Sequence, residues 1–367
     1  MPNAADESVE IAARHQVHLE RLKTGDVNDT KKFLKQVDRS VRAKLSGIDL
    51  TDFTRARLNT LLASVRADLA IIQGEITDFT KKQMIDLAES EAAFESRALG
   101  QVVKFDFVIP SADQLASAVF TNPLSVVGAD GGKLIEPFIK ELNGKQLEGV
   151  TNAIRQGFFQ GQTTQEVLRN IRGTKAAGFS DGVIGRLDKS MATVTRTALQ
   201  HASSQAREAV WQRNKKVVKR VLWVSVLDGR TSQICRGLDG RDFPLNSGPR
   251  PPIHLNCRST TAPVLDAKFK SLDDGGTRAA RGKSGKISRA PADQSYYGWL
   301  KTQGPKFQNS AIGPQRAKLL RDGGLSSQRF QELQLGKNFE PLTLKKMRDL
   351  DPAAFEKAGI KLPKNQE

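Results

Sequence analysis

The sequence predicts an α+β fold in which α-helices predominate, and three observations support this prediction. Long stretches carry apolar residues at intervals of three and four, which is the period of an amphipathic helix. Runs of β-branched and aromatic residues are short and fall mainly within residues 217–266. Charged residues make up 26% of the chain and aromatic residues 6%, which suits helices with wide solvated faces better than a large buried sheet.

Breaks in these patterns divide the chain into four expected parts. They are, in order, an N-terminal helical bundle (1–110), a central module of helices and a β-hairpin (111–270), a basic glycine-rich linker (271–292) and a small helical C-terminal unit (293–367). A chain of 367 residues is long enough for two or three such modules with at least one well-formed core.

The N-terminal part is expected to be helical over residues 6–100. Its strongest stretch follows several capping side chains at Asp49–Asp52. An apolar seam then runs through Leu58, Leu62, Val65, Leu69, Ile72, Ile76 and Phe79. About three heptads are marginal for a free coiled coil, so we expect a hairpin or bundle with the segments around Ile11–Leu22 and Phe33–Leu45.

Residues 101–150 are less regular. Phe105–Ile109 alternates weakly and stops at Pro110, which predicts a short strand. Proline and glycine interrupt the pattern further along, at Pro123, Gly131, Gly132 and Pro137. We therefore place a module boundary in this region.

Three helices are expected between residues 146 and 216. The first ends at Gly157 and Gly161, and Thr163 or Thr164 caps a short second helix that stops at Gly173. The third is long and runs from about Val183 to Asn214. Basic residues crowd its C-terminal end, where they complement the helix dipole and could also contact phosphate; they are Arg207, Arg213, Lys215, Lys216, Lys219 and Arg220.

Residues 217–266 change character. The run Val221–Val226 predicts a strand, and Ser259–Leu265 predicts a returning strand. Between them lie two strong turn signals, Asp228-Gly229 and Asp239-Gly240. Thr231 or Ser232 is expected to cap one helical turn between these signals.

The expected linker combines glycines with charge. Its basic residues are Arg278, Arg281, Lys283, Lys286 and Arg289, and no acid lies between Gly275 and Ala290. We interpret it as a tether that binds a polyanion. Short helices should follow around Tyr296–Leu300 and Arg316–Leu320, and three more should begin at Ser326 or Ser327, at Thr343 and at Pro352.

Charge and composition limit the classes of protein. The formal net charge of +17 favours nucleic acid or another polyanion as a partner. Only two cysteines are present, so the chain is not a disulfide-stabilised secreted scaffold. The polar, acidic N-terminus lacks a signal peptide, and no apolar run reaches the roughly 20 residues of a membrane span. We expect a soluble protein made in the cytoplasm.

The segment from Trp223 to Arg258 is dense in residues that could carry chemistry, and it permits three interpretations. A metal site would use Cys235, His254 and Cys257, with a fourth ligand from His201, an aspartate or water. A nuclease would combine His254 and Asn256 with Asp228 and Asp239, but no GxSxG, Walker or HExxH motif accompanies them.

The third interpretation is structural, and we favour it. Asp228 and Arg230 would lock a turn, and Arg258 would satisfy carbonyls or a carboxylate nearby. The two cysteines would be small buried apolar side chains or a disulfide. No catalytic residue is assigned, and the only cofactor considered is a structural zinc ion.

The order of residues in this segment resembles the signature of the Mu F-like minor head proteins, the phage head morphogenesis family. The residues that carry the resemblance are Trp223, Asp228, Arg230, Thr231, Ser232, Cys235, Leu238, Asp239, Gly240, Pro251, Pro252, His254, Asn256, Cys257 and Arg258. The resemblance covers roughly residues 120–265, and the block Tyr296–Gln303 is similar to a C-terminal extension of some members. Residues 1–110 resemble nothing known.

The resemblance implies a minor capsid protein of a tailed bacteriophage, a virion component associated with the portal and the capsid interior. Its expected partners are the portal protein, the major capsid protein and double-stranded DNA, and it could form an oligomer on the portal. It would assist virion assembly and DNA packaging or ejection. The rival hypothesis is a metal-dependent DNA nuclease or a zinc-stabilised DNA-binding module.

Overall fold

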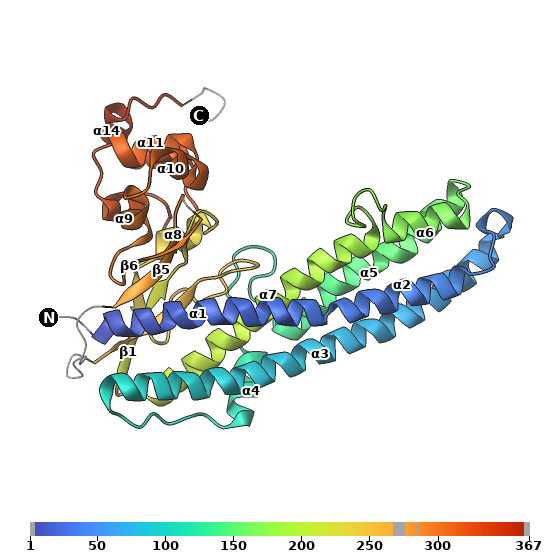
Figure 1. The fold of residues 1–367 in the computed structure, drawn as a ribbon, viewed down its shortest axis with the longest axis horizontal. Coiled ribbons are helices and arrows are strands. Elements are labelled where there is room, and N and C mark those ends of the chain that lie inside the picture. Colours follow the sequence, from blue (N-terminus) through green and yellow to red (C-terminus); the bar gives the residue numbers. More distant parts are fainter. Residues whose placement is uncertain (1–3, 267–275, 284, 363–367) are drawn as a thin grey trace.

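The computed structural model describes residues 4–266, 276–283 and 285–362. Helices account for 62% of the residues and strands for 9%, which confirms the predominantly helical α+β class. Long helices run side by side along the long axis of the molecule, and two small sheets and the C-terminal helices gather at one end (Figure 1). No helix in the described ranges is long and apolar enough to cross a membrane.

The helical body consists of the seven helices that the structure describes between residues 4 and 213. They are α1 (Ala4–Asp29), α2 (Lys31–Leu45), α3 (Arg55–Val103), α4 (Ala112–Thr121), α5 (Ile135–Phe159), α6 (Thr164–Arg172) and α7 (Val183–Arg213). A single 3₁₀ turn, Leu50–Asp52, lies between α2 and α3. Thr163 caps α6 in a reciprocal capping box with Glu166, as the sequence predicted for this position.

Two details of the helical body differ from expectation. Helix α5 begins earlier than predicted, because Pro137 lies in its first turn, where a missing backbone N–H costs nothing. The predicted strand at residues 105–109 is wrong. Instead of a neighbouring strand, the Asn214 side chain pairs with the backbone of Val108, accepting from its N–H (3.0 Å) and donating to its carbonyl (2.9 Å).

The apolar cores do not follow the predicted boundary after residue 110. One core joins α2 and the first half of α3 to α5, α6 and the start of α7. Another joins the second half of α3 and α4 to the end of α7 and the first strand. The N-terminal helices therefore pack as part of the same body as the central helices.

Two three-stranded sheets lie against the end of this body. The first has β1 (Val218–Val224) in the centre, antiparallel to β3 (Asp242–Pro244) and β4 (Thr260–Leu265). The second joins β2 (Leu227–Asp228), β5 (Thr277–Arg281) and β6 (Ile287–Pro291). Helix α1 packs on them through Val9 and Ala12, which share a small core with Val224, Ala262 and Ala292.

The prediction of a tether is wrong for the residues that the structure describes. Residues 277–281 and 287–291 form the antiparallel pair β5 and β6, and β5 also pairs with β2 in parallel. Ala280 of β5 and Ala290 of β6 are buried in the C-terminal core and attach the hairpin to it. Residues 271–275 of the expected linker, and its predicted boundary after 270, lie outside the described residues.

The C-terminal unit has its own core of aromatic and aliphatic side chains. Its helices are α9 (Tyr296–Lys301), α10 (Pro305–Ile312), α11 (Pro314–Asp322), α12 (Ser327–Glu332), α13 (Leu344–Leu350) and α14 (Pro352–Lys357). Ser326 and Thr343 cap α12 and α13, as predicted, while α10 had not been predicted.

Candidate functional site

The dense segment identified in the sequence folds around the end of β1. Trp223 is fully buried, and its indole N–H donates to the Ser225 hydroxyl (2.9 Å). That hydroxyl donates in turn to the carbonyl of Cys235 (2.7 Å) in the short helix α8 (Gln233–Leu238). The following turn carries Gly240 at φ 75°, a left-handed conformation that glycine adopts without strain.

Asp228 organises a second turn. Its carboxylate accepts the N–H of Arg230 (2.9 Å) and the hydroxyl of Thr231 (3.1 Å). Arg258 reaches the same carboxylate with two guanidinium nitrogens, at 2.7 and 2.9 Å. Burial alone would raise the pKa of Asp228, but the hydrogen bonds and charge of Arg258 outweigh it and hold the pKa below its ordinary value. The group is therefore an ion-pair partner that fixes the fold.

The loop before β4 is attached to α7. Pro252 is buried, and the peptide bond that precedes it is cis. Asn256 has φ 56°, in the left-handed region that asparagine tolerates better than most residues. Its N–H donates to the Thr197 hydroxyl (3.1 Å), and its side-chain amide donates to the Thr193 hydroxyl (3.2 Å).

The prediction that Arg278 belongs to a nucleic-acid-binding surface is wrong. Arg278 is buried, and its guanidinium donates to Asp239 and to the carbonyl of Ser225. Asp239 also accepts the N–H groups of Ser225 and Tyr296, both at 2.7 Å. The pair therefore joins β1, the β5–β6 hairpin and the C-terminal unit, and Arg278 is not available to phosphate.

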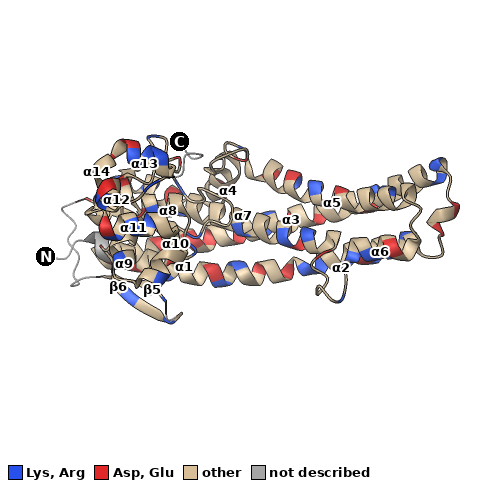
Figure 2. Cartoon of the chain, turned by 90° about the horizontal axis from the view of Figure 1, so that it is seen from above, with Lys and Arg blue, Asp and Glu red and all other residues tan. Residues whose placement is uncertain are grey.

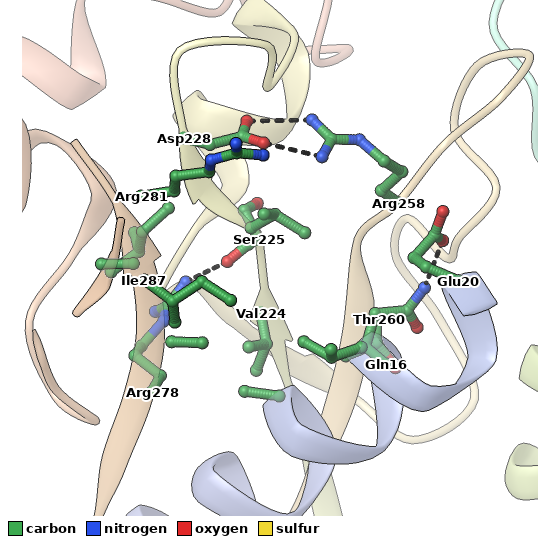
Figure 3. Close-up of a pocket in the computed structure, with 16 residues that line it drawn as sticks. Gln16, Glu20, Val224, Ser225, Asp228, Arg258, Thr260, Arg278, Arg281 and Ile287 are labelled. Carbon is green, nitrogen blue, oxygen red and sulfur yellow. Dashed lines mark hydrogen bonds and ion pairs between the residues drawn. The ribbon is translucent and has the colours of Figure 1, made fainter. Parts of the chain in front are cut away.

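A cavity of about 230 Å³ lies between α1 and the two sheets. Figure 3 shows Arg281 pointing across it toward the Asp228–Arg258 pair, while Val224 and Ile287 supply apolar lining. Gln16 and Glu20 of α1 line the side next to Arg258.

The three predicted metal ligands converge. The nearest atoms of Cys235, His254 and Cys257 all lie within 4.8 Å of one another. The Cys235 sulfur lies 3.2 Å from His254 Nε2 and 3.8 Å from the Cys257 sulfur. Burial raises the pKa of Cys257, but hydrogen bonds from Cys235 and His254 outweigh it and lower the pKa overall. Both cysteines are buried, and they do not form a disulfide.

His201 is not near these ligands, so its proposed role as a fourth ligand is wrong. It is buried between α7 and α4, where its Nε2 contacts the carbonyl of Val119 at 2.9 Å. Because a carbonyl only accepts, this nitrogen must carry the proton. Asp228 and Asp239 are likewise occupied by their arginines. Among the ligands considered from the sequence, water is the one left for a fourth position.

His201 predicts a specific dependence of stability on pH. Burial lowers the pKa of His201 from 6.5 to about 4. Between these values the unfolded chain binds a proton that the folded chain does not, so stability falls as the pH drops from 6.5 to 4. We expect this side chain to account for a loss of roughly 3 kcal/mol over that window.

Chemical denaturation at a series of pH values would measure this loss. His201→Gln, which keeps a donor for the Val119 carbonyl, should flatten the curve between pH 6.5 and 4. His18→Gln, at an exposed position on α1, should leave the curve unchanged. Identical pH profiles for the wild type and His201→Gln would refute the assignment.

Sequence reasoning missed a buried ion pair. Arg207, which we had grouped with exposed basic residues, lies inside the protein and pairs with Glu95 of α3 at 2.9 Å. A signal was present in the sequence: Glu91 and Glu95 continue the apolar face of α3 after Met84 and Leu87. Acids on a buried face require partners, and a basic residue on the inward face of α7 provides one.

The other predicted basic residues differ in exposure. Arg213, Lys215, Lys216 and Lys219 are exposed at the end of α7, although Lys219 lies 3.6 Å from Asp266. Arg220 is half-buried and paired with Asp242. On the hairpin, Arg281, Lys283, Lys286 and Arg289 are exposed, and Arg289 pairs with Glu10 of α1. Basic and acidic side chains alternate along the helices (Figure 2).

The fold and the site together define a class of protein. Helices α5 to α7 lead into a small sheet whose signature residues bind one another, in the order of the head morphogenesis signature. Residues 148–262 match the family described as Phage Mu protein F like protein, so this part of the chain is similar to that family. No curated protein and no solved structure matches the chain.

Proposed function

We propose that the protein is a minor structural protein of a tailed-bacteriophage head that binds the portal or the capsid interior and the packaged DNA. In that position it would assist head assembly and genome packaging or ejection. The observation that carries the proposal is the Mu F-like match over residues 148–262, since that family is one of phage head morphogenesis.

The chemistry of the signature residues agrees with a structural role. Asp228 is bound by Arg258, and Asp239 by Arg278, so neither carboxylate is left to act as a base or to hold a catalytic cation. The thiols of the Cys235 cluster are buried. These contacts argue against the nuclease hypothesis and favour residues that stabilise a binding module.

The position of the protein in the particle tests the proposal directly. Purified procapsids and mature virions should contain the chain, and crosslinking should join it to the portal or the major capsid protein. Its absence from both particles would contradict the proposal. A plasmid-nicking assay with the wild type and His254→Ala tests the rival, because metal-dependent nicking that this change abolishes would favour the nuclease.

The DNA part of the proposal rests on charge. The chain has a formal net charge of +17, and several basic residues stand exposed where α7 meets β1. Exposed lysine and arginine side chains neutralise phosphates without reading sequence, and binding of this kind weakens steeply as salt rises. The end of α7 is the strongest candidate because Arg213, Lys215 and Lys216 all stand exposed there within four residues of the chain.

Neutralising this cluster should weaken binding to DNA. We expect the triple variant Arg213→Gln, Lys215→Gln and Lys216→Gln to reduce the slope of log affinity against log salt by roughly 3, since each lost phosphate contact reduces it by about 0.9. Filter binding with random-sequence duplexes between low and physiological salt would measure the slope.

A matched control lies on α2. Lys31→Gln, Lys35→Gln and Arg39→Gln remove the same charge from exposed positions on this helix. If the two triple variants change the slope equally, general charge and not the end of α7 governs binding. Affinity that does not vary with salt would contradict phosphate contacts altogether.

A further inference from the structure

The cluster of Cys235, His254 and Cys257 has the dimensions of a metal centre. In a tetrahedral zinc site with Zn–S bonds of about 2.3 Å, two sulfur ligands lie about 3.8 Å apart, and a sulfur lies about 3.5 Å from an imidazole nitrogen. The sulfurs of Cys235 and Cys257 are 3.8 Å apart, and His254 Nε2 is 3.2 Å from the Cys235 sulfur. A disulfide would require about 2.0 Å between the sulfurs.

The orientation of His254 supports a ligand role. Its Nδ1 lies 2.8 Å from the backbone carbonyl of Leu255. Because a carbonyl can only accept, Nδ1 carries the proton, and in the neutral ring Nε2 presents a lone pair toward the two thiols. Metal-binding histidines are commonly held in this way, with the second nitrogen donating to a carbonyl.

The surroundings of the cluster explain what a metal would do. The thiols come from α8 and from the loop before β4, and they pack with Trp223, Ile234, Leu238, Ile253 and Leu335. Residues 245–259, apart from turns, carry no helix or strand. A metal would therefore attach this loop to α8 beneath β1, and Leu335 would attach the C-terminal unit to the same point.

We infer that Cys235, His254 and Cys257 bind one structural zinc ion in the region that matches the Mu F-like family. The fourth ligand is a water molecule or the hydroxyl of Ser232, which lies 2.9 Å from His254 Nε2. Two thiolates neutralise the charge of the ion, which is what a buried site requires. Cys235 and Cys257 are 1% and 0% exposed, so their thiolates are shielded from solvent and the ion would stabilise this region.

Metal analysis of the full-length chain tests this inference. Protein produced without an affinity tag, or with the tag removed, should contain one zinc ion per chain by mass spectrometry. Cys235→Ser, Cys257→Ser and His254→Gln should each lose the bound zinc. His18→Gln, which changes an exposed histidine on α1, should retain it.

Two further measurements need no variant and so remain valid if the variants do not fold. Cobalt added to the metal-stripped wild type should give a tetrahedral absorption spectrum with a thiolate-to-cobalt charge-transfer band. Returning zinc to the stripped chain should raise its melting temperature. A wild type that contains two reactive thiols and no metal, shows no such band and gains no stability from zinc would overturn the inference. A disulfide between the two cysteines would overturn it as well.

Discussion

Asp239→Asn is expected to lower the free energy of unfolding by about 3–5 kcal/mol, the usual effect of removing one partner from a buried ion pair. The change leaves the guanidinium of Arg278 buried without a counter-charge, because the side chains of this pair are only 3% and 0% exposed. It also weakens the acceptor for the N–H groups of Ser225 and Tyr296. Equilibrium unfolding in urea would measure the loss.

The geometry further predicts where the variant fails first. Since Asp239 joins β1 to the β5–β6 hairpin and to the start of α9, its loss should expose the hairpin to protease before the helical body unfolds. Asp242→Asn is the matched control, because its ion pair with Arg220 is nearly half exposed and pairs of that kind contribute about 1 kcal/mol or less. Equal losses in the two variants would contradict the role assigned to Asp239.

Local signals predicted much of the fold. The capping residues Thr163, Ser232, Ser326 and Thr343 start helices where the sequence placed them, because a cap needs only a side-chain oxygen that accepts the backbone N–H three residues later. The length of α7 and the positions of β1 and β4 follow from apolar spacing and β-branched residues in the same way.

What the sequence did not reveal depends on distant partners. Arg278 looked like part of a solvated basic tether, since no acid lies between Gly275 and Ala290, yet its carboxylate comes from 39 residues earlier. Arg207 looked like part of an exposed cluster, and its partner Glu95 lies 112 residues away. Charge patterns along a chain indicate which groups need partners, but only the tertiary structure selects them.

For the metal cluster too, the sequence indicates which neighbouring residues act together but not which distant residues join them. The spacing of His254 and Cys257 marks them as a pair that lies within one loop. That Cys235 joins them follows from the return of the chain around Trp223 and could not be derived from spacing. His201, which has the right chemistry, is excluded only because α7 places it against α4.

The second large effect is expected at Glu95 of α3. Its carboxylate accepts from Arg207 (2.9 Å) and from the indole N–H of Trp211 (2.7 Å), both on α7. Arg207 also donates to the hydroxyl of Thr260 and the carbonyl of Thr261 in β4, so one buried group joins three elements. Glu95→Gln should therefore cost about 3–5 kcal/mol of folding stability, because Arg207 would remain buried after losing the carboxylate that pairs with it directly.

Guanidinium unfolding followed by tryptophan fluorescence would report the loss, and Trp211, one of the three tryptophans that contribute, contacts Glu95 directly through its indole. Glu89→Gln on the exposed face of α3 is the control and should change stability by less than about 0.5 kcal/mol. Because Glu95 lies in the N-terminal helices and Arg207 in the region that matches the Mu F-like family, the expected result is one cooperative transition shifted as a whole. Two separate transitions, with only the earlier one altered, would show that α1 to α3 fold independently of that region.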